Sequence, residues 1–420
     1  MSDAMIGVEE FRREARAWIE ANLEPRQDVR PGRVLDEVTT PEQVNVARAL
    51  QRKLFDAGFA GISYPAEYGG RGLTAAHERA FREEALRYHT PDFGVAGSVT
   101  FGAIGRSIVS HGSPEFCQQH VPAILRGDEV WCQFYSEPEA GSDLAGIRTR
   151  AVRDGDRWIL TGSKIWSSGA YLADWAMCLA RTDWDAPKHR GLTWFAVPTD
   201  AKGVTVNRIR QINGGAEFCE EFLDEVEVTD DDVIGEVNRG WSVTQTMLVY
   251  ERGAGEGGSV STLEPRNLAS DLVALARRVG RVDDPAARQA IAKAHINDYA
   301  QYHLGRRISE RLRASSNPDH AVAAYSKLAA GVLTPLRSRL ALEVGGPAAL
   351  AWTAGDEVEG RPALDYLNGR RISIAAGTNE VQRNGIGERV LGLPREPSFD
   401  TNKPFNEVLK NARNWDGKVG

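Results

Sequence analysis

Residues 149–166, TRAVRDGDRWILTGSKIW, contain two short β-prone runs on either side of Asp154-Gly155. Both turn residues tolerate a positive φ, so this stretch predicts a β-hairpin. Further β-type runs lie at 175–180, 191–197, 203–209 and 226–228. Because turn residues and no helical pattern separate these runs, we expect a small antiparallel barrel or sandwich in the middle of the chain.

Helical periodicity flanks this β region on both sides. Before it, Phe11, Ala15 and Ile19 repeat along one helical face, and similar patterns occupy 44–58 and 75–89. After it, four amphipathic segments predict a helix bundle, at 241–252, 268–279, 286–308 and 325–344. The expected fold class is α+β, mainly α, in three parts. These are an N-terminal helical domain (1–128), an antiparallel β-barrel domain (129–238) and a C-terminal four-helix bundle (239–420).

Composition excludes several function classes. At 420 residues, two or three packed units are expected, and 42% hydrophobic with 26% charged residues is ordinary for globular proteins. The net charge of −7 argues against nucleic-acid binding, which needs a concentrated positive surface. No stretch approaches the roughly 20 apolar residues that cross a bilayer, so we expect a soluble protein with no membrane segment.

The cysteines indicate the compartment. Cys117, Cys132, Cys178 and Cys219 are scattered and form no CxxC pair. A disulfide framework is therefore not expected, and a reducing cytoplasmic location fits best. Cys117 and His120 would make half a metal site, but no second half follows at useful spacing, so no metal is expected.

Two glycine-rich segments match the dinucleotide-binding fingerprint by letter. Residues 253–258, GAGEGG, fit GxGxxG, and residues 70–75, GRGLTA, fit its GxGxxA variant. The fingerprint has meaning only between a strand and a helix of a βαβ unit. The first segment follows a helical pattern and the second follows a loop, so a Rossmann site is not expected.

Three motifs carry a family resemblance. Residues 134–143, FYSEPEAGSD, resemble the EPxAGSD signature of acyl-CoA dehydrogenases. Residues 162–169, GSKIWSSG, look like the GxKxWITN strand of that family, and residues 376–383, AGTNEVQR, are similar to its EGTxxIQR box. The resemblance covers nearly the whole chain. It implies a helix–β–helix architecture, FAD as cofactor, a role in fatty acid or lipid catabolism, and oxidation of the α,β bond of an acyl-CoA.

The resemblance also assigns cofactor contacts. A flavin ring is flat and edged with polar groups, so it needs backbone and hydroxyl partners and an apolar wall. Ser136 and Ser168 match positions whose hydroxyls contact the ring, and Trp166 matches the wall. The full set assigned to FAD is Gln133, Tyr135, Ser136, Gly141, Trp166, Ser168, Gly345, Gly346, Thr378 and Glu380.

Some of these assignments have an ordinary structural alternative. Gln133 and Tyr135 share a strand face by period-2 alternation, with backbone atoms available to the ring. Gly345-Gly346 matches a pair where backbone approaches the FAD nucleotide, but two glycines would equally end a helix. Ser142 matches a position near the CoA pantetheine, so the resemblance places the substrate there.

The catalytic base departs from the commonest family pattern. Removal of the α proton needs a carboxylate, and in most members it precedes the Gly-Thr of the last motif. That position is Ala376 here. Other members carry the base on a bundle helix before an arginine, and Glu251-Arg252 matches that arrangement. We therefore expect Glu251 to be the base, Arg252 its electrostatic neighbour and Glu256 the fallback candidate.

The backbone of Ala376 keeps a role whatever its side chain. In the family this N–H donates to the thioester carbonyl and stabilises the developing enolate. A small side chain at Ala376 also leaves space for a bulky or branched acyl chain, including an alicyclic one. The resemblance further implies an electron-transfer flavoprotein or similar acceptor, and a dimer or tetramer that is homo- or hetero-oligomeric.

Two other functions remain open on the same fold. A flavin monooxygenase or oxidase would activate oxygen and need not bind CoA. A non-catalytic subunit would pair with a catalytic homologue, and the loss of the carboxylate at Ala376 favours that reading. Ser142 and Glu251 favour the dehydrogenase.

Overall fold

The computed structural model describes residues 6–26, 39–251, 268–313, 320–350, 357–395, 397–398 and 400–408. Its contacts divide the chain into two compact units. Unit 1 contains Met1–Gln211, Gly215–Glu251 and Pro397–Gly420, and unit 2 contains Ile212–Gly214 and Arg252–Glu396. The domain limits expected from the sequence stay predictions.

The N-terminal part of unit 1 is helical, as predicted. Its helices are α1 (Val8–Asn22), α2 (Pro41–Asp56), α3 (Ala75–Ala85), α4 (Gly94–Gly97), α5 (Gly105–His111) and α6 (Pro114–Arg126), and Ser98–Ile104 forms a π-helical turn before α5. Helix α2 begins at a capping box in which Thr40 and Gln43 satisfy each other's backbone N–H. Helix α3 ends at Ala85, short of the predicted residue 89. Residues 57–74, all described, contain no strand before α3, so the fingerprint at 70–75 lacks its βαβ context.

The middle of the chain forms one eight-stranded sheet. The strands are β1 (Trp131–Phe134), β2 (Arg150–Asp154), β3 (Arg157–Ser168), β4 (Trp175–Arg181), β5 (Leu192–Pro198), β6 (Val204–Ile209), β7 (Phe218–Thr229) and β8 (Val233–Ile234). Their order is β6-β7-β3-β2-β4-β5-β8, with β1 paired to β4. The predicted hairpin is confirmed: Asp154 pairs with Arg157, and Gly155 has a φ of 63°.

The predicted barrel needs correction, because the sheet is open. Over residues 129–238, all described, β6 pairs only with β7 and the two-residue β8 only with β5. The sheet is also not fully antiparallel, since β1 and β2 both run parallel to β4. Short edge strands of this kind end a sheet without closing it.

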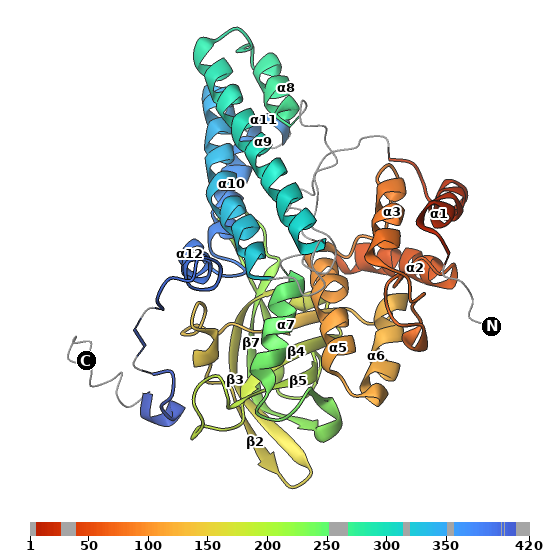
Figure 1. The fold of residues 1–420 in the computed structure, drawn as a ribbon, viewed down its shortest axis with the longest axis vertical. Helices are drawn as coiled ribbons and strands as arrows, with labels where there is room; N and C mark the ends of the chain where they lie inside the picture. Colours follow the sequence, from red (N-terminus) through yellow and green to blue (C-terminus); the bar gives the residue numbers. More distant parts are fainter. Residues whose placement is uncertain are drawn as a thin grey trace. The chain divides into compact units, whose positions relative to one another are not determined.

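Helix α7 (Gly240–Glu251) packs within unit 1, beside α5 and against the sheet (Figure 1). Its buried Val243 and Met247 join a core that contains Trp131 and Trp194 of the sheet. The first of the four segments predicted for the bundle thus packs against the sheet in this structure. The buried face of α7 is narrow and consists of Gly240, Val243, Thr244 and Met247. Periodicity alone does not indicate which element packs against this face.

Unit 2 is helical, as predicted for the C-terminal part. It contains α8 (Ser270–Arg278), α9 (Pro285–Arg313), α10 (Ala323–Gly345), α11 (Glu357–Gly369) and α12 (Asn379–Gly385). The two long helices α9 and α10 lie side by side (Figure 1), and Leu272, Ala294 and Leu340 form part of their shared core with α8. Helix α11 was not predicted, because Gly360 and Pro362 interrupt its pattern. Within the described residues, the structure has no helix long and apolar enough to cross a membrane.

Candidate active site

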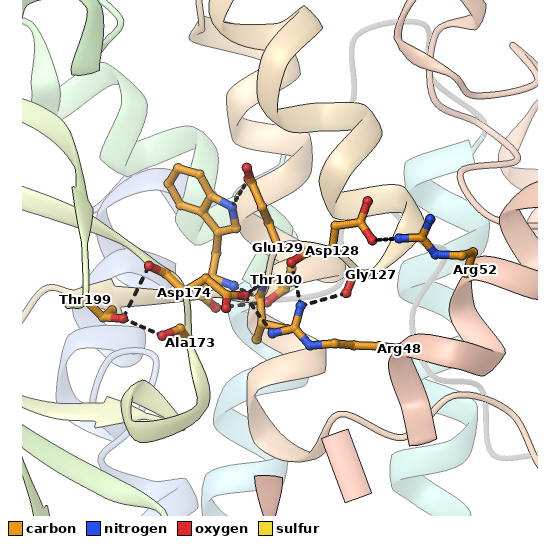
Figure 2. A network of polar contacts seen from close by, with 11 residues as sticks. Arg48, Arg52, Thr100, Gly127, Asp128, Glu129, Ala173, Asp174 and Thr199 are labelled. Carbon is orange, nitrogen blue, oxygen red and sulfur yellow. Dashed lines mark hydrogen bonds and ion pairs between the residues drawn. The ribbon is translucent and has the colours of Figure 1, made fainter. Parts of the chain in front are cut away.

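A polar network anchors the start of β1, the strand that leads to the first motif (Figure 2). Arg48 of α2 donates to the carbonyls of Gly127 and Asp128 at 2.8 and 2.5 Å, and to Asp174 at 2.7 Å. The Thr100 hydroxyl donates to the Trp131 carbonyl and accepts from its N–H, both at 2.9 Å. The N-terminal helices therefore fix where β1 begins.

Two alternate side chains along β1 and its continuation, Gln133 and Tyr135, face helix α7. Gln133 Nε2 lies 3.0 Å from the Met247 sulfur, and the Tyr135 ring packs edge-to-face on Trp194, with ring centroids 4.9 Å apart. The Tyr135 hydroxyl also reaches the Thr244 carbonyl at 3.5 Å. The prediction that Gln133 and Tyr135 share a face is confirmed. Their side chains are engaged in packing, so only their backbone remains to meet a cofactor.

The end of β1 lies against β3. The Ile165 N–H donates to the Ser136 carbonyl at 2.9 Å, which brings Ser136 beside Trp166. The register of β3 against β7 shifts between Ile165 and Ser167, so Trp166 sits in a bulge. It adopts a φ of 68°, is 55% exposed and makes an edge-to-face contact with Phe218, centroid to centroid 6.0 Å.

This surface fits a flavin ring. A bulky residue at positive φ costs on the order of 1–3 kcal/mol, and such strain clusters at binding sites. Trp166 offers an exposed apolar face, and the half-buried Ser136 and Ser168 offer hydroxyls beside it. An apolar wall with a few convergent polar groups is the donor set that an isoalloxazine needs. The roles of Ser136, Trp166 and Ser168 toward FAD stay predictions.

The first motif is held by a buried ion pair. Glu137 accepts from Lys164 Nζ at 2.9 Å and from the N–H groups of Arg148 and Thr149 at 2.6 and 2.8 Å. Burial alone would raise the pKa of Glu137, but the Lys164 charge and these hydrogen bonds outweigh it and lower the pKa. The glutamate of the motif is thus a structural anchor, while Gly141 and Ser142 are exposed on the following loop.

Glu251 is the last residue of α7 and is exposed. The helix end is tied to α5, because the Tyr250 hydroxyl lies 3.3 Å from Ser110 Oγ and the Thr246 hydroxyl lies 2.8 Å from His111 Nε2. The direction in which α7 presents Glu251 is therefore set by two helices. Arg252 and Glu256 lie outside the described residues.

In unit 2, the last motif forms a tight turn before α12. Ala376 and Gly377 have φ values of 53° and 90°, and Gln382 Nε2 donates to the Ala376 carbonyl at 3.1 Å. Among the described residues, no backbone carbonyl accepts from the Ala376 N–H. The Thr378 hydroxyl caps α12 by accepting from the Val381 N–H at 3.2 Å. The turn therefore leaves the Ala376 N–H without a backbone acceptor among the described residues. Thr378 caps a helix, in addition to the FAD contact predicted for it.

The glycine pair and Glu380 also lie in unit 2. Helix α10 ends at Gly345, and Gly346 follows with a φ of 60°, so the helix-stop interpretation of the pair is confirmed. A Cβ on Gly346 would lie 2.7 Å from the movable end of the Arg281 side chain, so the positive φ is what favours glycine at this position. Glu380 is 76% exposed at its side chain and pairs with Arg383 at 3.4 Å. The predicted FAD contacts of all three stay predictions.

The predicted residues therefore form two local groups. Within unit 1 the structure brings Ser136 beside Trp166 and Ser168, with Gln133 and Tyr135 leading to them. Within unit 2 the Ala376 turn leads directly into the α12 cap at Thr378. That the two groups serve one site is a prediction.

Three buried charged residues were missed by the sequence interpretation as site supports: Lys164, Arg181 and Glu221. Lys164 lies inside a quoted motif but was given no role. Glu221 alternates with the buried Cys219 and Leu223 along β7, so the period-2 pattern already places this carboxylate in the core. Arg181 ends a continuously apolar strand, and no pattern indicates that it is buried.

Comparisons with known proteins match three domains of one family along the chain. The chain matches the acyl-CoA dehydrogenase N-terminal domain over residues 8–128, the middle domain over 132–226 and the C-terminal domain over 238–391. It is 37% identical over 401 residues to the acyl-CoA dehydrogenase IpdE1 of Mycobacterium tuberculosis, covering 93% of this chain and 99% of that protein.

Solved structures agree with these matches. The Tcur3481-Tcur3483 steroid ACAD is 30% identical, with a TM-score of 0.73 over 93% of this chain and 98% of that chain. The ChsE4-ChsE5 complex of Mycobacterium tuberculosis is 27% identical, with a TM-score of 0.69 over 94% of this chain and 100% of that chain. These likenesses show that the chain belongs to the acyl-CoA dehydrogenase family of FAD-dependent enzymes that oxidise acyl-CoA thioesters.

Proposed function

We propose that this chain oxidises the α,β carbon–carbon bond of a bulky acyl-CoA, with Glu251 as the base that removes the α proton. Bound FAD would supply the hydride acceptor. The observation that carries the proposal is the exposed Trp166, held at positive φ beside Ser136 and Ser168. A strained, exposed tryptophan flanked by hydroxyls is better explained by a bound aromatic ring than by folding alone.

Glu251 is the carboxylate best suited to proton removal. The position before the Gly377-Thr378 turn is Ala376, which has no ionisable side chain. Glu251 is exposed at the end of a helix that two contacts with α5 hold in place. A bound thioester would exclude water from it and raise its pKa toward the range of a useful base. Arg252 would stand beside it as a cation.

The thioester carbonyl needs a donor as the α proton leaves. Ala376 is held at a φ of 53°, and none of the described backbone carbonyls accepts from its N–H. A backbone N–H fixed by its turn stabilises a developing enolate without reorganisation. Ser142, exposed on the loop after Glu137, would contact the pantetheine arm, and Thr378, Glu380 and the Gly345-Gly346 pair would lie along the FAD phosphates and nucleotide.

We infer an alicyclic or steroid-derived acyl chain. The methyl side chain of Ala376 leaves space where other family members carry a carboxylate. The structure named a steroid ACAD is 30% identical over 93% of this chain, which supports a polycyclic acyl group here. The physiological acceptor would be an electron-transfer flavoprotein or a similar carrier.

A hetero-oligomer is the second candidate assembly. Two related structures are named as pairs of chains, Tcur3481-Tcur3483 and ChsE4-ChsE5. With its Gly-Thr carboxylate replaced by Ala376, this chain could be one member of such a pair, either catalytic or supporting. A homodimer or homotetramer is the alternative.

One preparation tests both readings. The full chain is purified alone, its FAD content is measured, and a steroid-derived acyl-CoA is added without oxygen. Loss of the oxidised flavin absorbance supports the dehydrogenase, and a colourless chain that cannot be reconstituted with FAD overturns it. A flavin that bleaches only when a homologous partner chain is present assigns this chain to a heteromer. Rapid reoxidation of the reduced protein by oxygen would favour an oxidase instead.

A further inference from the structure

The last described stretch of the chain, residues 400–408, returns to unit 1 after the helices of unit 2. We name it the C-terminal strap. Its Phe405 N–H donates to the Ala186 carbonyl, and its Asn406 N–H donates to the Trp184 carbonyl, both at 3.0 Å. The strap is therefore bonded along its backbone to the loop that joins β4 to β5.

Phe405 is the apolar anchor of the strap. It is 2% exposed, and its ring packs 5.6 Å from that of Trp184, centroid to centroid. The Arg181 guanidinium lies over the same ring, 3.6 Å from its centroid. Contact with an aromatic face stabilises a cation, and more so where water is excluded. Phe405 thus covers a fully buried arginine.

Arg181 in turn holds the loop that follows the first motif. It donates to the carbonyls of Ala145 and Ile147 at 2.5 and 3.2 Å, and to that of Lys188 at 3.3 Å. The carbonyls of Ala145 and Ile147 lie in the same loop as the exposed Gly141 and Ser142, a few residues further along the chain. A planar guanidinium fixes several acceptors at once, so its own position determines the path of the loop.

A second connection runs through Lys188. Its ammonium donates to Asp143 at 2.9 Å and to Asp400 of the strap at 2.6 Å. Burial alone would lower the pKa of Lys188, but its bonds to Asp400 and Asp143 outweigh it and raise the pKa. Asp143 is next to Ser142 and its side chain is 60% exposed, whereas that of Asp400 is only 16% exposed. Asp400 is therefore the partner that fixes the ammonium.

Both connections end on the same loop from the same strap. We infer that Asp400 and Phe405 are positioning residues for acyl-CoA, acting through Lys188 and Arg181 on residues 141–147. The inference rests on the proposed function, which places the pantetheine arm at Ser142. It extends the substrate site to a segment more than 250 residues away in the sequence. The strap touches neither Trp166 nor Ser136 in any described contact, so flavin binding should not depend on it.

The test uses the full-length FAD-loaded protein and free coenzyme A as the probe. Asp400→Asn removes the charge and keeps the shape, so the Kd for coenzyme A should rise roughly tenfold, as expected for losing one charged hydrogen bond. Asp400→Glu should recover most of the affinity. Lys403→Gln neutralises an exposed charge in the same strap and should leave the Kd unchanged. FAD content should be the same in the wild-type protein and in these three variants.

Hydrogen exchange provides a readout that does not need substrate. The Gly146 N–H bonds the Asp143 carbonyl at 2.8 Å, and the Ile147 N–H bonds the Leu144 carbonyl at 3.3 Å. Asp400→Asn should speed exchange of these two amides, and Phe405→Ala should speed it more, provided the latter still binds FAD. Where Phe405→Ala does not fold, Phe405→Leu keeps the apolar anchor without the aromatic face.

The outcomes distinguish a failure of the positioning role from a failure of the proposed function. An unchanged Kd in Asp400→Asn overturns the positioning role, even where the two amides exchange faster, because the strap would then only support the fold. A loss of FAD along with coenzyme A binding also overturns it. A wild-type FAD-loaded protein that binds no coenzyme A refutes the proposed function itself, and the inference with it.

Discussion

The Ser167 hydroxyl donates to Glu221 Oε2 at 2.8 Å, and both side chains are buried in the sheet. Ser167 stands between Trp166 and Ser168, the two residues that carry the predicted flavin surface. The other carboxylate oxygen of Glu221 is buried and has no hydrogen-bond partner among the residues that the structure describes. Trp166 thus stands at positive φ on the exposed face of β3, while the next residue, Ser167, contacts a buried carboxyl group on the opposite face.

Burial raises the pKa of Glu221 to about 7, against the opposing effects of the Ser167 hydrogen bond and the Lys164 charge. The Glu220 charge raises this pKa further, and the thiols of Cys132, Cys178 and Cys219, which interact with Glu221, have pKa values that burial raises as well. These thiols stay neutral near pH 7. Of the groups in this cluster, Glu221 is the one expected to change charge in the neutral range.

The first prediction concerns stability as the pH rises from about 4.5 to 7. Because the folded state binds the Glu221 proton more tightly than the unfolded state, this group's contribution is complete below about pH 4.5 and declines as the pH rises through 7. At about 1.4 kcal/mol per pKa unit, the loss is on the order of 3 kcal/mol. Glu221→Gln should flatten the decline in the free energy of unfolding between about pH 4.5 and 7, measured with urea. Asp224→Asn removes an exposed carboxylate of the same strand and should keep the decline; identical slopes in both variants would refute the assignment.

The second prediction concerns the buried pair of Glu137 and Lys164. The pKa of Glu137 is lowered, so its contribution is present above the unfolded value and is lost as the pH falls through the folded one. Glu137→Gln leaves a buried ammonium without its carboxylate, and breaking such a pair costs roughly 3–5 kcal/mol. Urea unfolding at neutral pH measures this cost.

A double change provides the control for that pair. Lys164→Met combined with Glu137→Gln removes both charges, so the double variant should be less destabilised than the sum of the two single variants. Strict additivity would mean that the two side chains act independently, in spite of the 2.9 Å between them.

The third prediction separates flavin binding from folding. Because Trp166 is 55% exposed, Trp166→Ala should change the stability of the FAD-free protein by only about 1 kcal/mol or less. FAD retention through gel filtration should nevertheless fall, since the flavin wall is gone. Phe222→Ala removes an aromatic side chain of similar exposure, 45%, from the neighbouring strand β7 and should retain FAD. Equal FAD content in the two variants would show that Trp166 packs elsewhere.

The helices and strands could be predicted from the sequence more accurately than the contacts between them. The hairpin at Asp154-Gly155 and the alternation around Gln133 and Tyr135 depend on local backbone preferences, which periodicity records. The open sheet was not predictable, because closure depends on whether the edge strands β6 and β8 pair with each other, which no local pattern records. For the same reason, the pattern of helix α7 did not indicate that it would pack against the sheet.

The candidate site shows the same division. The motifs located Ser136 and Trp166, but no pattern indicated that Trp166 would stand at positive φ in a bulge. The strap was missed altogether, because its contacts join residues near 184 to residues near 405 and have no local signature. Contacts of such long sequence separation are the part of a fold that single-sequence patterns do not contain.

The fourth prediction concerns Glu251. Glu251→Gln keeps the shape of the side chain but removes the base, so flavin reduction by an acyl-CoA substrate should slow by roughly 10²–10⁴. Thioester binding should change far less, because the Ala376 N–H is untouched. Stopped-flow absorbance without oxygen measures both quantities. Glu236→Gln, an exposed carboxylate just before α7, is the matched control and should reduce at the wild-type rate.

Restoring a carboxylate at the other position is the stricter test of the same base. The family resemblance assigns the base either to Glu251 or to the position of Ala376, so both should reach the same α carbon. Adding Ala376→Glu to Glu251→Gln should therefore recover part of the reduction rate, with a changed pH dependence because the new carboxylate has different neighbours. Glu256→Gln should leave reduction nearly intact, since it keeps the proposed base. Near-normal reduction by Glu251→Gln alone would instead remove Glu251 from the mechanism and, if Glu256→Gln is slow, transfer the role to Glu256.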